Sequence, residues 1–467
     1  MTKQTALNKI FKNSGLIFGA ALLFVLSFIL QINFSVAVFS LSIFLYLKNR
    51  KFTLNGFSLL NFSLLFVIIF AASYLIISKA LPIFYIPFAV IPMLTTLLFN
   101  QIEISLLITL LSSISVAAIM PVYSPYLCLF FLISGILSSL MVLAARRRIA
   151  IIRAGLIIGV IQAITLIFLD RFWLFEPSRY LILVTNGIIC SIIVLGTLPV
   201  FENLFKTVTN ISLLELADFN HPLLQRMIQE APGTYHHSLM VGNISEAACL
   251  AVGANALLAR IGAYYHDIGK IQKPEYFSEN QNKSMSLHDT LSATMSKLII
   301  MNHVKEGAEL AKKYKINPRL IDFILQHHGN SLVYYFYRRA LEGLEEDQEI
   351  KEEGFRYHGP KPNSKETAIV LLADSVEAAT RALKDPAPAK IEEIVHKVIN
   401  NKFIDGQLDE CELTLKDLEK ISLVFIRILS GIYHGRITYP EGSDENNHKK
   451  SSKENSHQSQ KDKGSSS

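Results

Sequence analysis

Tyr264-Tyr265-His266-Asp267-Ile268-Gly269-Lys270 is the stretch of sequence that decides how the C-terminal half of the chain is interpreted. The apolar spacing over 254–267 has the 3.6-residue period of an α-helix, so the adjacent His266 and Asp267 are expected at the end of a helix. By itself a His-Asp pair is more often a surface or capping pair than a pair of ligands. Its meaning therefore depends on what the rest of the chain adds.

Metal-ligand side chains occur at four further places, all in or at the ends of predicted helices. Asp374 directly follows the apolar run 368–373, where a lone carboxylate needs a partner. Neutral imidazole together with carboxylate suits iron, manganese, zinc and similar divalent ions. Two such ions about 4 Å apart form a known arrangement for phosphoester hydrolysis. The four places are Tyr235-His236-His237, Asn302-His303, Gln326-His327-His328-Gly329 and Ala373-Asp374-Ser375.

Helical periodicity continues through the rest of this half, so residues 201–440 are predicted to form an all-α domain. Asn317 before Pro318 indicates a helix start, with a capping side chain ahead of a proline in the first turn. Gly329 indicates a helix stop. Residues 441–467 are polar with almost no hydrophobic side chains and are predicted to be a disordered tail. The predicted helices are 202–207, 211–217, 221–230, 233–252, 254–267, 287–314, 317–328, 331–343, 364–383, 389–401 and 414–433.

The N-terminal half differs in composition and charge. Residues 1–200 contain thirteen Lys and Arg but only three Asp and Glu, whereas the remainder has a net charge of −4 and all thirteen histidines. The overall charge of +6 therefore combines two unlike halves and does not indicate a nucleic-acid-binding surface. With 51% apolar and 18% charged residues, a protein that is soluble throughout is excluded. Four widely spaced cysteines without a CxxC pair exclude a disulfide scaffold.

Residues 1–200 are predicted to form a polytopic membrane bundle of about eight helical spans. One basic cluster precedes the first span, a second follows the second span, and a third lies between the sixth and seventh spans. With eight spans, all three basic clusters and the C-terminal half of the chain lie in the cytoplasm. If the first two segments form one long helix instead of a hairpin, the count is seven. The spans hold almost no ionisable side chains, which favours an anchor and sensor over a transporter. The candidate spans are 14–31, 34–48, 57–78, 81–99, 103–121, 124–144, 151–170 and 178–200.

Short motifs extend the pattern well beyond the ligand residue types. They are Leu214-Glu215-Leu216, Ala231-Pro232-Gly233-Thr234-Tyr235-His236-His237-Ser238, His266-Asp267-Ile268-Gly269-Lys270, Glu279-Asn280-Gln281, His303-Val304-Lys305-Glu306-Gly307, His327-His328-Gly329, Gly359-Pro360-Lys361-Pro362 and Ala373-Asp374-Ser375-Val376-Glu377-Ala378. In this order they resemble the HD superfamily of metal-dependent phosphohydrolases, and within it the seven-transmembrane HD family. The resemblance implies a multi-pass protein of the bacterial inner membrane whose cytoplasmic HD domain hydrolyses cyclic di-AMP to the linear dinucleotide pApA.

The resemblance also implies roles for individual residues, with iron or manganese as the metals. Lys270 would act with Asp267 in catalysis by steadying the phosphate. Arg381 lies two helical turns beyond Asp374 and is a candidate phosphate contact, with a surface salt bridge as the alternative. The resemblance selects His237 rather than His236 as the ligand of that pair. One ion would be held by His237, His266, Asp267 and Asp374, and the other by Asp267, His303, His327 and His328, so that Asp267 bridges them.

Several features depart from the family's pattern. Only a few residues separate the first two spans, where family members usually carry a large extracellular domain. Asn330 stands where threonine is commoner, and His358 stands where proline is expected and is not needed as a ligand. The Gly-Tyr-Pro signature of the cyclic di-GMP branch is absent from its usual place. The expected partners are a cyclic dinucleotide and the lipid bilayer, with no nucleic-acid polymer, and self-association into a homo-oligomer stays open. The alternatives are hydrolysis of another nucleotide such as (p)ppGpp and a non-catalytic nucleotide-binding receptor.

Overall fold

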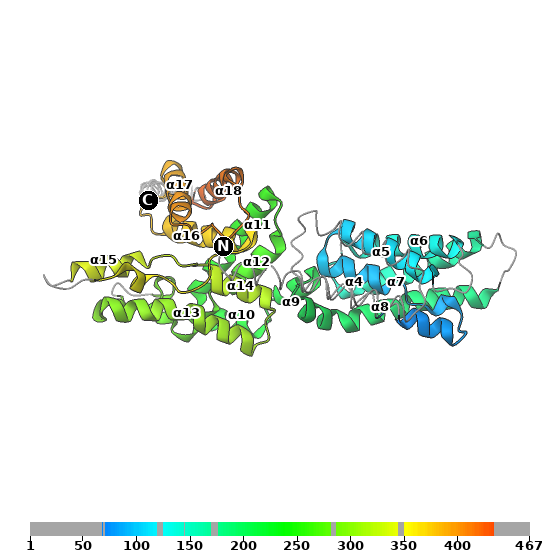
Figure 1. Cartoon of the computed structure of the whole chain (residues 1–467). Coiled ribbons are helices and arrows are strands. Elements are labelled where there is room, and N and C mark those ends of the chain that lie inside the picture. Colours follow the sequence, from blue (N-terminus) through cyan, green and yellow to red (C-terminus); the bar gives the residue numbers. More distant parts are fainter. Residues whose placement is uncertain are drawn as a thin grey trace, which may run out of the picture.

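The computed structural model describes residues 68, 71–118, 125–143, 145–169, 176–281, 286–343 and 350–433. Over these ranges the chain is helical, and its β-pairing is limited to one isolated bridge between Leu332 and Arg356. The predicted all-α fold class is therefore confirmed. Helices α4 to α8 form one group and α10 to α18 a second, with α9 between them (Figure 1).

The N-terminal group contains three helices that are long and apolar enough to cross a membrane, among the residues described. These are α6 (Pro125–Leu143), α7 (Arg148–Leu169) and α8 (Pro177–Phe205). Helices α7 and α8 approach closely, since a Cβ on Gly187 would lie 2.2 Å from the carbonyl oxygen of Gly155. Such close contact between small residues is typical of helix packing in membranes.

Two details of the predicted helices in this half need correction. The span predicted at 81–99 is interrupted, because a short 3-10 turn (η1, Ile83–Tyr85) precedes a ten-residue helix α4 (Val90–Phe99). Prolines at 82, 87 and 92 explain the break, since proline lacks the N–H that a continuous helix needs. Helix α8 extends to Phe205 and so includes most of the helix predicted separately at 202–207, while α5 (Ile102–Ala118) covers the described part of the span predicted at 103–121.

The other predicted spans fall on residues that are largely outside the described part. The segments 14–31 and 34–48 lie entirely outside it. Of the segment 57–78, residues 68 and 71–78 are described and are helical. The count of about eight spans therefore stays a prediction.

The C-terminal group packs around one hydrophobic core that α11, α12, α14, α16 and α18 share. Asn317 caps α14 by accepting a hydrogen bond from the Arg319 amide, as predicted from the sequence. The helices and 3-10 turns are α10 (Pro222–Glu230), α11 (Pro232–Val252), α12 (Ala256–Tyr265), η2 (Ile268–Gln272), η3 (Pro274–Tyr276), η4 (Ser278–Asn280), η5 (Leu287–Thr290), α13 (Ala293–Lys313), α14 (Pro318–Gln326), α15 (Tyr334–Glu342), η6 (Glu352–Phe355), α16 (Lys365–Arg381), α17 (Pro388–Ile404) and α18 (Leu415–Tyr433).

The short helix α9 (Asn210–Leu216) belongs to both groups. Ile211 is buried in the core of the membrane helices, and Leu213 is buried in the core of the C-terminal group. At the start of α7, the Arg148 guanidinium donates to both carboxylate oxygens of Glu215 at 2.6 and 2.9 Å. The two groups are thus joined by shared apolar packing and an ion pair.

Candidate metal centre

The candidate site lies inside the C-terminal group, where five helices bring their ligand-type side chains together. His237 comes from the second turn of α11, His303 from α13 and Asp374 from α16. The remaining residues lie at helix ends: His266 and Asp267 follow α12, and His327 and His328 follow α14. All seven predicted residues meet in one place, and six of them are buried.

The Asp267 carboxylate lies at the centre of the cluster and faces imidazole nitrogens on both sides. Its Oδ2 atom is 3.2 Å from His266 Nε2 and 3.6 Å from His237 Nε2. Its Oδ1 atom is 3.3 Å from His303 Nε2 and 3.5 Å from His327 Nε2. The two oxygens of one carboxylate are therefore directed to two different groups of histidines.

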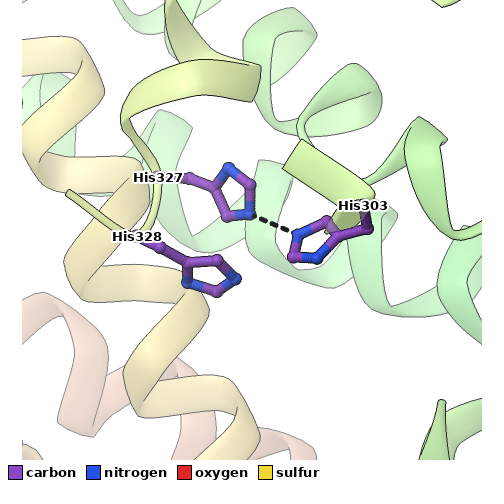
Figure 2. A group of neighbouring side chains, drawn as sticks. All are labelled: His303, His327 and His328. Atoms are coloured by element: carbon purple, nitrogen blue, oxygen red, sulfur yellow. Dashed lines mark hydrogen bonds between the residues drawn. The ribbon is translucent and has the colours of Figure 1, made fainter. Parts of the chain in front are cut away.

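The Asp374 carboxylate closes the cluster on the side of α16. Its Oδ1 atom lies 3.0 Å from His237 Nε2, and its Oδ2 atom lies 3.7 Å from His328 Nδ1. The imidazoles of His303, His327 and His328 face one another, with 3.2 Å between the Nε2 atoms of His303 and His327 (Figure 2). Three sets of ligand atoms lie close enough together to hold a metal ion: His303, His327 and His328; His237, His266 and Asp374; and His266, Asp267 and His327.

Contacts outside the cluster orient four of the five imidazoles. The Nδ1 atom of His266 donates to the Ala263 carbonyl at 2.6 Å, and that of His327 donates to the Ile324 carbonyl at 2.9 Å. His303 Nδ1 bonds the Ile300 carbonyl in the same way. With the proton held on Nδ1, the Nε2 lone pair points into the cluster, which is the form of histidine that binds metals.

Glu377 plays the corresponding part for His237. Its Oε2 atom accepts from His237 Nδ1 at 2.6 Å, and both side chains are buried. Burial lowers the pKa of His237, but the carboxylates of Asp374 and Glu377 outweigh burial and raise it to about 9. Glu377 lies three residues after Asp374 and therefore on the same face of α16. This spacing in the sequence could have indicated that Glu377 lies near the cluster.

Two buried atoms of the cluster have no hydrogen-bond partner, namely His266 Nε2 and Asp267 Oδ1. An unpaired buried polar atom is costly, because it has lost water and gained nothing in return. A cation between these atoms would satisfy both. Imidazole and carboxylate together are donors suited to divalent transition metals, so the residues present fit a metal.

Lys270 lies against the cluster from the turn η2. Its Nζ atom is 2.8 Å from Asp267 Oδ2 and 2.7 Å from Glu279 Oε1. Burial lowers the pKa of Lys270, but the two carboxylates outweigh it and raise the pKa above its ordinary value. Burial raises the pKa of Glu279, and the Lys270 ammonium outweighs it and lowers the pKa to about 2. The ammonium is therefore held charged and in place.

Two glycines set the local backbone. A Cβ on Gly269 would lie 1.9 Å from the His303 carbonyl oxygen, so only glycine lets η2 pass this close to α13. Gly329, directly after the two histidines that follow α14, has a φ of +54° in the left-handed region, and its amide donates to the carbonyl of Gln326, the last residue of α14. These contacts explain why glycine follows the ligands in both motifs.

The other residues singled out in the sequence lie outside the cluster. His236 is exposed, unlike its buried neighbour His237. Arg381 Nη1 donates to Glu377 at 3.1 Å, so its contacts are those of the salt-bridge alternative, and the phosphate role stays a prediction. His358 is exposed and belongs to none of the three ligand sets. Sequence reasoning gave no role to Tyr357, whose ring stacks on His328 with 4.3 Å between centroids.

Comparison with known proteins identifies families and relatives that this chain resembles. Residues 234–379 match the family described as "HD domain", and residues 24–209 match the family described as "7TM receptor with intracellular HD hydrolase". The cyclic-di-AMP phosphodiesterase PgpH of Bacillus subtilis is 45% identical over 321 residues, which are 68% of this chain and 45% of the relative. PgpH of Listeria monocytogenes is 37% identical over 430 residues, covering 88% of this chain and 59% of the relative.

The chain therefore spans about half the length of the curated relatives that it matches. Among solved structures, the HD domain of L. monocytogenes PgpH in complex with cyclic di-AMP is 47% identical to this chain. That match has a TM-score of 0.45 and covers 46% of this chain and 99% of the other.

Proposed function

This chain belongs to the family of 7TM receptors with an intracellular HD hydrolase, and we propose that it is a membrane-anchored, metal-dependent phosphodiesterase that hydrolyses cyclic di-AMP to pApA. The observation that carries the proposal is the Asp267 carboxylate, whose two oxygens face separate groups of buried imidazoles. The names of the two PgpH relatives supply the substrate.

The HD domain implies divalent metal binding, and the identity and number of the ions belong to the proposal. We assign iron or manganese. Divalent ions bound here supply Lewis-acid activation of water and neutralise negative charge on the phosphodiester. One ion would be held by His237, His266, Asp267 and Asp374, and the other by Asp267, His303, His327 and His328.

The chain's own residues prepare this site before substrate arrives. The carbonyls and Glu377 that hold the Nδ1 protons fix each imidazole, so that little reorganisation is needed. Lys270, charged and fixed by Glu279, places a positive ammonium beside Asp267, where a phosphoryl oxygen can accept its hydrogen bond. These groups supply orientation and electrostatic stabilisation.

We further propose that residues 1–200 anchor the enzyme and that residues 201–440 form its catalytic domain on the cytoplasmic side of a bacterial inner membrane. The apolar helices α6 to α8 support the anchor, and the basic residues around position 148 support the orientation. A protease added to sealed inverted vesicles should cleave the HD domain, whereas protection there would refute the orientation.

The test of the activity uses the full chain purified in detergent with Mn²⁺. We expect wild-type protein to convert cyclic di-AMP to pApA, and to act far more slowly on cyclic di-GMP and ppGpp. His237→Ala should abolish turnover, while His236→Ala at the exposed neighbouring position serves as the matched control and should not. Wild-type protein that leaves cyclic di-AMP intact, or a His237→Ala variant with full turnover, would refute the proposal.

A further inference from the structure

Lys402, in the last turn of α17, forms no ion pair within the part of the chain that the structure describes, although the more distant carboxylates of Asp374 and Asp405 act on it electrostatically. Its Nζ atom donates to Ser331 Oγ at 2.8 Å. In the part of the chain that the structure describes, no carboxylate oxygen lies within ion-pair distance of it. The side chain is largely covered, and this burial lowers the pKa of Lys402. A covered ammonium with one neutral partner is a costly arrangement that an anion would relieve.

Contacts within the chain connect this ammonium to the metal cluster. The Ser331 amide donates to the His328 carbonyl at 3.0 Å, so Ser331 lies one turn beyond a cluster histidine. Tyr357 contacts both Ser331 and the cluster, because its amide donates to the Ser331 carbonyl at 3.0 Å and its ring stacks on His328. Asp374 of the cluster also acts electrostatically on Lys402.

Three other cations connected to the cluster are already paired. Lys270 lies between two carboxylates, and Arg381 pairs with Glu377. Arg356, whose Nη1 atom donates to the Asn330 carbonyl, pairs with carboxylates at 352 and 405. Among these four cations, Lys402 is therefore the one available to an incoming anion.

We propose that Lys402 and Ser331 bind the second phosphate of the cyclic dinucleotide, the one that is not being hydrolysed. This inference rests on the proposed function. A cyclic dinucleotide carries two phosphodiesters with one negative charge each, and only one of them can occupy the metal cluster. The other needs a positive partner when the substrate is enclosed, and an ammonium beside a hydroxyl provides a charge-assisted contact for it. The pair would thus select substrates with two phosphates.

The test compares a substrate that has two phosphodiesters with one that has a single phosphodiester. The full chain in detergent with Mn²⁺ is assayed on cyclic di-AMP and on bis(4-nitrophenyl) phosphate. Lys402→Met preserves the side-chain length but removes the charge. It should raise KM for cyclic di-AMP by about 10- to 100-fold with kcat within about threefold, because one hydrogen bond to a charged group is lost. The kcat/KM for the single-phosphate compound should change by less than about threefold.

Two further variants and a binding measurement complete the design. Lys397→Met, on the exposed side of the same helix, is the matched control and should leave both substrates unaffected. Lys402→Arg keeps the charge and should recover most of the affinity. Equilibrium dialysis of cyclic di-AMP against the chelator-treated chain should show weaker binding by Lys402→Met, and circular dichroism verifies that each variant is folded.

The outcomes separate the inference from the function on which it rests. An unchanged KM for cyclic di-AMP in folded Lys402→Met, or an equal loss with both substrates, would overturn the inference alone. The equal loss would mean that Lys402 supports the structure of the domain. A wild-type chain that does not hydrolyse cyclic di-AMP would overturn the proposed function together with this inference.

Discussion

Replacing Glu377 tests whether the imidazole of His237 is held in place for a metal. Glu377→Ala removes the carboxylate that accepts from His237 Nδ1 at 2.6 Å. It also leaves the Arg381 guanidinium, whose Nη1 atom lies 3.4 Å from Nδ1, without its acidic partner. The first change frees the His237 ring to turn away from the cluster, and the second leaves an unpaired positive charge beside the place that a cation would occupy.

The size of the effect follows from the contact. Both side chains are buried, with exposures of 2% and 9%, so solvent screens the hydrogen bond little. A hydrogen bond to a charged group contributes about 1.5–3 kcal/mol, which corresponds to about 10- to 100-fold in metal affinity. Glu377→Gln keeps an acceptor oxygen without its charge, and we expect a loss of about tenfold.

The assay is a titration of chelator-treated full-length chain with Mn²⁺, followed through hydrolysis of cyclic di-AMP. The Mn²⁺ concentration for half-maximal activity should rise in the order wild type, Glu377→Gln, Glu377→Ala, and saturating Mn²⁺ should restore most of kcat. Glu392→Ala, on the exposed surface of α17, is the control. Equal midpoints for Glu377→Ala and wild type would refute the reasoning.

Three further predictions concern the packing and charge around the cluster. Gly269→Ala places a Cβ 1.9 Å from the His303 carbonyl oxygen and should destabilise the domain by more than about 2 kcal/mol in urea unfolding followed by circular dichroism; wild-type stability would contradict this. Tyr357→Ala removes the ring stacked on His328 and should lower kcat/KM by about 2- to 10-fold, whereas Tyr357→Phe should behave as wild type, and equal behaviour of the two variants would count against the stacking. The Glu279 pKa lies near 2 instead of 4.5, so its ion pair stabilises the fold above about pH 4.5 and is lost as the pH falls toward 2. Glu279→Gln should therefore show a shallower loss of stability over this pH range, by up to about 3 kcal/mol, and an unchanged slope would be inconsistent with the pair.

The sequence was informative where local patterns determine structure. Helix periodicity and capping residues are local signals, and they predicted that pairs such as His266-Asp267 and His327-His328 lie in or at the ends of helices. The assignment of these residues to one site rested on their ligand chemistry and on the resemblance to the HD superfamily. The isolated carboxylate of Asp374 within an apolar helix face indicated a buried partner. The structure brings these residues together, while their roles as ligands stay proposals.

Contacts that depend on packing between distant segments could not be predicted in this way. Tyr357 reaches His328 because the segment around it pairs with residues 331–333, through the bridge between Leu332 and Arg356 and the flanking amides. This pairing joins segments about 25 residues apart and leaves no periodic signal. The interrupted helix near 81–99 is the opposite case, since its prolines are a local signal of a break that a continuous apolar pattern does not register.

Metal content and turnover, measured on the same sample, show whether Asp267 joins two metal ions in a phosphodiesterase site. The full chain is loaded without oxygen with Fe²⁺ or Mn²⁺, freed of excess metal, and compared with Asp267→Asn by elemental analysis and by chromatography of cyclic di-AMP products. We expect two ions per wild-type chain with formation of pApA, and loss of both bound metal and product in Asp267→Asn. Hydrolysis by a wild-type chain that holds no metal, or full metal content and turnover in Asp267→Asn, would contradict this expectation.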